Sequence, residues 1–470
     1  MISLPGLNLS APPSSSAAPL TTAPSVTRHQ DLPPGTEFRF EVSFAHTLTI
    51  RLLSGTAEFF GSELAPSQTY YFTGTKGAVY TWHGCKIEIS GEADSEYVAE
   101  ETGMMGYVNA HFGLESLRES AMMRGGETGP RVLVVGPENA GKTSLVKILT
   151  SYGVKAGRLP TVVNLDARQG MLSVPGSISA AAFSSIVDVE DGWGSSPISG
   201  PSPIPVKMPL VYHYGLANPE EGRVFRPLVT RMALAVTSRL EEDVAAKQAG
   251  FVIDSPGAIA QGKGGSYENI EHIISEFSVN VVFVIGSERL YSDLTRKYAS
   301  RPAEDPVSIV RLDQSGGCVT RDEEYMKQLR QAQIRAYFFG KDEERALNPH
   351  SQMADFTDLN VFKVVDASDN NPSFRPGDAD DDIYGASSAA IYERVTPSSL
   401  MQNSLLAITT ANPNDRQEVI RDSSVRGYMY VSDVDEAKKK VRLLSPQPGQ
   451  VPSTAIVWGS FPEDVPGLVN

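Results

Sequence analysis

Residues 131–153 read RVLVVGPENAGKTSLVKILTSYG, and this stretch decides the fold. It opens with the apolar run of residues 131–135, which is typical of a short buried strand. It closes with residues 144–153, whose amphipathic pattern predicts a helix. Between them, residues 136–143 fit the P-loop pattern. A strand, a glycine-bearing loop and a helix in this order predict an α/β domain that binds phosphate groups.

Each residue type in this loop has a physical reason. Gly136 and Gly141 permit a tight backbone path in which successive N–H groups point at phosphate oxygens. The helix that begins near Lys142 adds the positive end of its dipole. The Lys142 side chain can reach the β- and γ-phosphates, and the Thr143 hydroxyl can ligate Mg²⁺. The sequence therefore predicts a nucleotide site.

Two aspartates compete for the metal side of this site. The apolar strands predicted at residues 161–166 and 251–254 end in Asp166 and Asp254, and the carboxyl ends of parallel strands face the ligand crevice. A turn or helix-capping role is the alternative for each. The VIDSPG segment that contains Asp254 resembles a GTPase switch motif. No Asn-Lys-x-Asp motif follows the next strand, VNVVFVIG, which argues against a GTPase.

Two arginines are candidates for a phosphate-covering lid. Arg289 and Arg296 lie two helical turns apart in SERLYSDLTRKY and so share one face of the predicted helix. Such arginines can cover a phosphoryl group during its transfer. The alternative is that both arginines lie on a solvated helix face. Without evidence beyond the spacing, this alternative is favoured.

The rest of the chain divides around this unit. The first 30 residues are rich in Ser, Pro and Ala and predict a disordered head. Short alternating strands over residues 31–103 predict an antiparallel sandwich. Residues 104–345 predict the P-loop domain, with a mainly parallel sheet, a Pro-rich excursion at about 190–208 and, at 104–124, an extended stretch leading into a helix. Strand-like runs return over 346–470 and predict a β-rich domain.

Composition limits the function classes. The 470 residues include 41% hydrophobic and 21% charged residues, enough for several cores. The net charge of −15 argues against a nucleic-acid footprint over the whole chain, although a local basic groove stays possible. Two cysteines are too few for a disulfide framework. With no signal peptide and no apolar run of about 20 residues, we expect a soluble intracellular protein.

Several segments together resemble one family. They are RFEV, LLSGTAEFFGSEL, AVYTWHGC, RVLVVGPENAGKTSLVKIL, TVVNLDARQGMLSVPGSI, PLVYHYG, GSERLY, SLLAITTAN and VRLLSPQPGQVPS. The family is the P-loop subunit of the eukaryotic mRNA cleavage and polyadenylation machinery (fungal cleavage factor IA), which is related to polynucleotide 5′-hydroxyl kinases. The similarity runs from about residue 31 to the C-terminus.

The resemblance implies a set of site residues. It implies that Glu37 and Lys76 of the N-terminal domain grip adenine, and that Thr143 and Asp166 hold Mg²⁺. Asp166 matches the carboxylate that kinase members use near the acceptor hydroxyl. The phosphate-binding segment matches Gly136 and a run of six residues, Asn139, Ala140, Gly141, Lys142, Thr143 and Ser144.

The resemblance also implies the setting of the protein. The main partner is the scaffold subunit that binds the RNA polymerase II tail, alongside other cleavage and polyadenylation subunits. Pre-mRNA is contacted indirectly, and the location is the nucleus.

One departure decides between two functions. Where kinase members carry an Asn-Thr-Cys-Gly-Trp-like segment, this chain reads Asp254-Ser255-Pro256-Gly257-Ala258, so Ala258 replaces the tryptophan that clamps RNA. Base stacking on an aromatic side chain is worth about 1–3 kcal/mol. The leading hypothesis is a non-catalytic subunit with ATP and Mg²⁺ as a structural ligand. The alternative is an active RNA 5′-hydroxyl kinase that uses Asp166, Lys142, Arg289 and Arg296.

Overall fold

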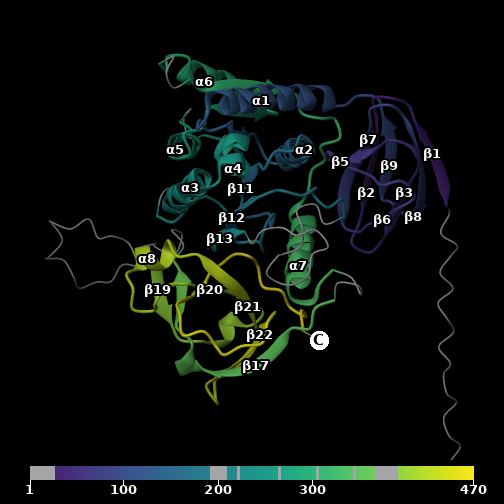
Figure 1. Cartoon of the computed structure of the whole chain (residues 1–470). Coiled ribbons are helices and arrows are strands. Elements are labelled where there is room, and N and C mark those ends of the chain that lie inside the picture. Colours follow the sequence, from purple (N-terminus) through teal and green to yellow (C-terminus); the bar gives the residue numbers. More distant parts are fainter. Residues whose placement is uncertain are drawn as a thin grey trace, which may run out of the picture.

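The computed structural model contains three β-sheet regions that follow one another along the chain (Figure 1). It describes residues 27–190, 209–219, 223–262, 266–302, 306–341, 346–365 and 390–469. The predicted disordered head lies outside these residues except for its last four, and the Pro-rich excursion lies outside except for residue 190. No helix in the described part of the chain is long and apolar enough to cross a membrane.

The N-terminal region is a sandwich of two antiparallel sheets, in the orders β1-β8-β3-β6 and β5-β4-β7-β2-β9. Alternate residues of β2 and β3, such as Phe38, Phe40, Leu48 and Ile50, point into the shared core. This alternation of inward-facing apolar residues is the pattern from which the sequence predicts the sandwich. The strands are β1 (Arg28–Leu32), β2 (Thr36–Val42), β3 (Leu48–Gly55), β4 (Glu58–Phe59), β5 (Ser62–Glu63), β6 (Thr69–Phe72), β7 (Thr75–Thr81), β8 (Cys85–Gly91) and β9 (Ser95–Ala99).

The prediction for residues 104–124 was partly wrong. No extended stretch precedes the helix, because α1 (Met104–Arg124) begins at once. Its buried residues recur every three or four positions, including Tyr107, Leu114 and Ala121, and this face packs toward α2 (Lys142–Lys155). Two glycines within α1 lower its intrinsic helix propensity, and tertiary packing overrides that preference.

The central sheet positions the P-loop. Its order is β13-β12-β11-β14-β10-β15-β16, and β11, β14, β10, β15 and β16 run parallel. The strands β12 and β13 are antiparallel additions. The core against α1 and α2 is distinct from the core against α3, α5 and α6, so helices cover both faces. The strands are β10 (Arg131–Val135), β11 (Thr161–Asn164), β12 (Ser177–Ala182), β13 (Leu210–His213), β14 (Phe251–Asp254), β15 (Val281–Ile285) and β16 (Ser308–Leu312), and the helices are α3 (Phe225–Glu242), α4 (Val244–Ala249), α5 (Glu268–Glu276) and α6 (Glu288–Tyr298).

The C-terminal region is a seven-stranded sheet in the order β17-β22-β21-β20-β23-β18-β19. The helix α7 (Glu323–Phe339) leads into it, and Tyr337 and Phe338 of α7 share the central core with Tyr428 and Tyr430 of β21. The elements are β17 (His350–Asp355), β18 (Val361–Val364), β19 (Tyr392–Val395), β20 (Leu405–Thr409), α8 (Gln417–Arg421), β21 (Val425–Asp435), β22 (Lys440–Ser445) and β23 (Ile456–Trp458). The predicted fold class, an α/β P-loop domain flanked by a β-sandwich and a β-rich domain, is confirmed.

Candidate functional site

The P-loop links β10 to α2 by an unusual backbone path. Gly141 has φ +88°, a conformation that L side chains rarely adopt. Gly136 passes so close to β15 that a Cβ atom there would lie 2.3 Å from the carbonyl oxygen of Ile285. Asn139, between them, also has a positive φ, +58°. The loop therefore needs its two glycines for the reasons that the sequence pattern indicates.

Lys142 begins α2 and is buried beneath this loop. Its side chain donates a hydrogen bond to the Pro137 carbonyl oxygen over 2.8 Å, and the residue is 6% exposed. Burial lowers the pKa of Lys142, and the nearby charges of Asp254 and Asp166 oppose that shift. No carboxylate of the described residues forms an ion pair with its ammonium group. A cation placed in this way is suited to an anionic ligand.

Asp254 is the carboxylate nearest to the Thr143 hydroxyl. It ends β14, between β10 and β11 in the sheet, and its Oδ2 accepts a hydrogen bond from Thr143 over 2.6 Å. Its other oxygen, Oδ1, is buried and has no hydrogen-bond partner among the described residues. Burial raises the pKa of Asp254 to about 6, although Lys142 and Thr143 act in the opposite direction. A divalent cation at this point would satisfy the unpartnered oxygen, so the residues present fit Mg²⁺.

Asp166 lies on the same cavity in a different setting. One oxygen accepts the backbone N–H of Arg168 over 3.1 Å, and the other accepts the Gln169 amide over 3.0 Å. The metal role of Asp166 stays a prediction. Asp254, the competing candidate in the sequence, is the carboxylate in direct contact with Thr143.

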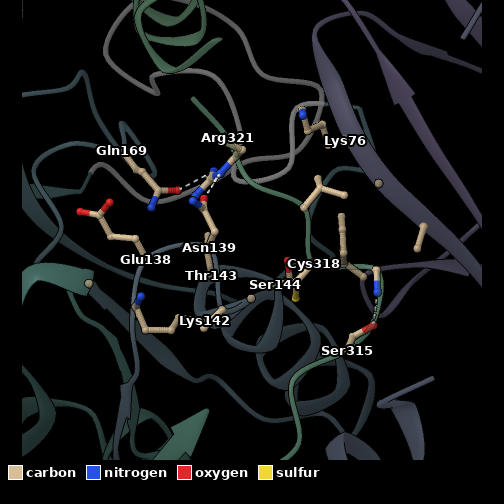
Figure 2. Close-up of a pocket in the computed structure, with 18 of the residues that line it drawn as sticks. Lys76, Glu138, Asn139, Lys142, Thr143, Ser144, Gln169, Ser315, Cys318 and Arg321 are labelled. Carbon is tan, nitrogen blue, oxygen red and sulfur yellow. Dashed lines mark hydrogen bonds between the residues drawn. The ribbon is translucent and has the colours of Figure 1, made fainter. Parts of the chain in front are cut away.

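Glu37 and Lys76 of the sandwich line the same cavity as the P-loop. Figure 2 shows Lys76 across this cavity from the P-loop residue Lys142. Glu37 is buried in β2, and its carboxylate accepts hydrogen bonds from Arg39 over 2.7 Å and from the Thr102 hydroxyl. Lys76 of β7 forms an ion pair with Glu41 over 2.8 Å. Each oxygen of Glu37 accepts one hydrogen bond, and a carboxylate oxygen has room to accept a second. The adenine-gripping role of both residues stays a prediction.

Sequence reasoning missed a third contributor, the segment from residue 313 to 322 between β16 and α7. Cys318 lies so near Gly141 that a Cβ on that glycine would be 2.9 Å from its Sγ. Arg321 donates hydrogen bonds to Asn139 of the P-loop and to Gln169, both over 3.2 Å. The only sequence signal is the Ser-Gly-Gly-Cys turn after a strand at 308–312, and such turns are common in loops.

The two predicted lid arginines do not line this cavity. Arg289 and Arg296 are on α6 with side chains 76% and 81% exposed. The nearest carboxylate to each is Asp293, at 3.8 Å and 3.9 Å. Both arginines therefore lie on an exposed face of α6. Their lid role during phosphoryl transfer stays a prediction.

Ala258 lines the cavity on the same side as an ion pair between Glu138 of the P-loop and Arg168. Ala258 is half-buried and lines the cavity beside Pro256. Glu138 of the P-loop accepts a hydrogen bond from Arg168 over 3.2 Å, and a Cβ on Gly257 would meet the Glu138 backbone at 2.6 Å. This wall offers no aromatic side chain at the Ala258 position for stacking against a base.

The buried carboxylate predicts a pH-dependent effect of Asp254→Asn in ligand-free protein. The folded-state pKa of Asp254, about 6, lies above the ordinary value of 3.8. Protonation of this carboxylate therefore stabilises the folded state. That contribution is complete below about pH 4 and is lost as the pH rises through 6. Removing the charge should raise the free energy of unfolding at pH 8 by on the order of 2 kcal/mol, with little gain at pH 4. Urea unfolding in EDTA at both pH values measures this.

The control for that experiment is Asp243→Asn, at the half-buried N-terminal cap of α4. Its side chain accepts the backbone N–H groups of Ala245 and Ala246, and asparagine caps a helix about as well as aspartate, so this variant should change the free energy of unfolding little at either pH. An Asp254→Asn variant that is less stable than the wild type at pH 8 would mean that the ionised carboxylate stabilises the ligand-free site.

Comparisons with known proteins cover nearly the whole chain. Residues 31–121 match the N-terminal beta-sandwich domain of polyadenylation factor, and residues 136–340 match the P-loop of mRNA cleavage and polyadenylation factor CLP1. Residues 347–463 match the pre-mRNA cleavage complex II protein Clp1. The three matched segments correspond to the three sheet regions.

Two fungal relatives are similar over their full lengths. The mRNA cleavage and polyadenylation factor CLP1 of Phaeosphaeria nodorum is 68% identical over 473 residues, which cover 100% of both chains. The protein of the same description from Botryotinia fuckeliana is 49% identical over 465 residues, 98% of each chain.

Two solved structures share the fold. One is Clp1p in a wild-type Clp1p–Pcf11p complex, with a TM-score of 0.82, 27% identity and coverage of 93% of this chain and 99% of that chain. The other, with the same values, concerns an extended interface between Pcf11p and Clp1p and the structural basis for ATP loss in a glycine-to-arginine point mutant.

Proposed function

This chain belongs to the Clp1 family of mRNA cleavage and polyadenylation factors, and we propose that it holds ATP and Mg²⁺ as a structural ligand within a pre-mRNA 3′-end processing complex. The observation that carries this proposal is the shared cavity. The P-loop lines it together with the sandwich and the segment at 313–322. A nucleotide bound there would contact three separate parts of the chain.

The energetic argument needs no turnover. A ligand that binds only the folded state stabilises that state by RT ln(1 + [L]/Kd), which is about 2.7 kcal/mol at a concentration of 100 Kd. A nucleotide between the sandwich and the P-loop domain would hold their relative positions. The surfaces that a partner recognises would then depend on ATP.

In this arrangement the residues have separate roles. Lys142 and the P-loop N–H groups would bind the phosphates, and Thr143 would hold Mg²⁺ together with Asp166 or Asp254. The metal would neutralise part of the phosphate charge. Glu37 and Lys76, at the sandwich end of the cavity, would fix the adenine.

The proposed partner is a Pcf11-type scaffold. Both solved relatives concern Clp1p with Pcf11p, and this chain shares their fold over 93% of its length. We propose further that this scaffold binds the RNA polymerase II tail and that the chain also assembles with the other cleavage and polyadenylation subunits. Its contact with pre-mRNA would be indirect, and it would act in the nucleus.

An active RNA 5′-hydroxyl kinase is the second candidate. The observation in its favour is that Lys142, Thr143 and Asp166 all line the cavity. Ala258 at the acceptor side and the exposed positions of Arg289 and Arg296 favour the structural role.

Transfer of labelled γ-phosphate from ATP to a 5′-hydroxyl RNA oligonucleotide tests the choice. We expect no label above a Lys142→Ala blank, together with intact ATP released from the purified wild-type protein. A known kinase of this class serves as the positive control. Label on the RNA would establish the kinase, and absence of ATP from protein saturated with Mg·ATP would remove the structural role. Label with only the Ala258→Trp variant would identify the missing aromatic clamp as the sole defect.

A further inference from the structure

Strand β9 of the N-terminal sandwich (Figure 1) has one edge without a partner strand. It is the last strand in the order β5-β4-β7-β2-β9, and it pairs only with β2, over residues 95–99. Residues 95–98 are all exposed, so no described part of the chain covers this edge. A strand with one neighbour points alternate N–H and C=O groups outward, where another extended chain can bind them.

Other edge strands are protected in ways that β9 is not. Charged side chains, bulges and covering segments are the usual protection. Arg311 lies on the edge strand β16, and the N–H of Tyr71 on the edge strand β6 donates to the Glu190 side chain over 2.7 Å. In β9 the single charged residue, Glu96, is bound by Arg28 over 2.8 Å, and the register with β2 is unbroken. Among the described residues, no side chain forms a hydrogen bond with the β9 backbone, so this edge is open to pairing.

Carboxylates lie at both ends of this open edge. Residues 92–101, EADSEYVAEE, contain five carboxylates and no Lys, Arg or His. At the start of β9, the side chains of Glu92 and Asp94 are 79% and 50% exposed, and their ion-pair contacts are to His46, at 3.6 Å and 3.8 Å. At its other end, exposed Glu100 forms no ion pair with a described residue. The edge therefore lies in a negative potential that the surrounding side chains do not neutralise.

We propose that the open edge of β9 binds an extended, basic peptide segment of a partner protein by strand addition. Main-chain hydrogen bonds to β9 would hold the segment, and its Lys or Arg side chains would meet the carboxylates at the two ends of the strand. A second copy of this chain would bring the same carboxylates to the edge, and nucleic acid would bring phosphates, so like charges oppose both. The inference goes beyond the proposed function and does not depend on ATP binding.

Hydrogen exchange of the full chain tests where such a peptide binds. The probe is a synthetic peptide in which Lys and Val alternate, added at low ionic strength, where surface charges are least screened. We expect it to protect those amides of residues 95–99 that face away from β2. The same peptide with Pro in place of Val cannot donate main-chain hydrogen bonds at those positions, and the peptide with Glu in place of Lys is repelled, so neither should protect them.

Peptide affinity tests the role of the carboxylates. The double variant Glu92→Gln/Glu100→Gln should weaken binding of the Lys–Val peptide by about 3- to 10-fold, because it removes two exposed charges that each contribute modestly. The matched control is Glu241→Gln/Glu242→Gln, which removes two exposed charges from α3 and should bind the peptide like the wild type. Thermal midpoints of both double variants should match the wild type, since all four side chains are on the surface.

Four results would overturn the inference. Protection by the Pro-containing peptide equal to that by the Lys–Val peptide would mean that the carboxylates attract cations without strand pairing. Peptide-induced protection outside residues 95–99, or none at all, would place the basic segment elsewhere or nowhere. Protection of 95–99 that increases with protein concentration in the absence of peptide would assign the edge to a second copy. Unchanged affinity in Glu92→Gln/Glu100→Gln would remove the charge argument; if that variant fails to fold, the three peptides on the wild type decide.

Discussion

Lys142→Ala is expected to weaken ATP binding by at least 100-fold while leaving the protein folded. The ammonium group lies beneath the P-loop, where its present partner is the Pro137 carbonyl oxygen at 2.8 Å. Phosphate oxygens would replace this neutral partner with charge-assisted bonds, and a loss of about 2.7 kcal/mol corresponds to 100-fold in affinity. Titration of the wild type and the variant with Mg·ATP measures the difference directly.

Thermal unfolding separates loss of binding from loss of folding. Burial already lowers the pKa of Lys142, which means that the site disfavours its charge when no ligand is bound. The ligand-free variant should therefore unfold near the wild-type temperature, and only the upward shift on adding ATP should vanish. Lys86→Ala, at a partly exposed strand position in the sandwich, is the matched control and should keep the full shift. A normal ATP-dependent shift in Lys142→Ala would place the phosphates elsewhere.

The P-loop could be predicted because its chemistry is local. Residues 136–143 are consecutive, and the pattern itself states which backbone path and which side chains the loop provides. The sandwich was predictable for a similar reason, since alternation along β2 and β3 marks the face that packs inward. In both cases a short stretch of sequence contains all the information that is needed.

The rest of the site comes from residues far apart in the sequence. Arg321 reaches Asn139 across 182 positions and Gln169 across 152. Arg39 looks like one more charged residue in a strand, yet it is buried and paired with Glu37 two positions away. No periodicity or composition marks such residues, because their role depends on how the sheets and loops pack.

The choice between Asp166 and Asp254 shows the same limit. Both end apolar strands, so the sequence treats them alike. The sheet order separates them, because β14 lies next to the P-loop strand and β11 lies one strand further away. Asp254 therefore contacts Thr143, while Asp166 is bonded to its own turn.

A buried ion pair that joins the central and C-terminal regions predicts the largest loss of stability. Arg330 of α7 is 1% exposed, and its guanidinium binds both oxygens of Glu463, one of them over 2.9 Å. It also donates to Glu323 over 2.6 Å. Its Nη1 is buried and has no hydrogen-bond partner among the described residues, so the guanidinium has no further hydrogen bond to offset the loss of a carboxylate. Glu463→Ala should therefore lower the free energy of unfolding by about 3–5 kcal/mol, because it leaves a buried charge with one carboxylate instead of two.

Arg330→Met should cost less than Glu463→Ala, by about 2 kcal/mol or more, although both variants destroy the same ion pair. Methionine removes the buried charge and keeps much of the side-chain volume, and replacing buried charges by apolar groups is often close to neutral. The carboxylates left behind can be hydrated, since the side chains of Glu463 and Glu323 are 35% and 64% exposed. Urea unfolding of the full chain measures both variants, with Arg335→Met on the exposed face of α7 as the control. If Arg330→Met proved the more damaging of the two, attraction within the ion pair, rather than the penalty of an unpaired buried charge, would dominate the stability of this contact.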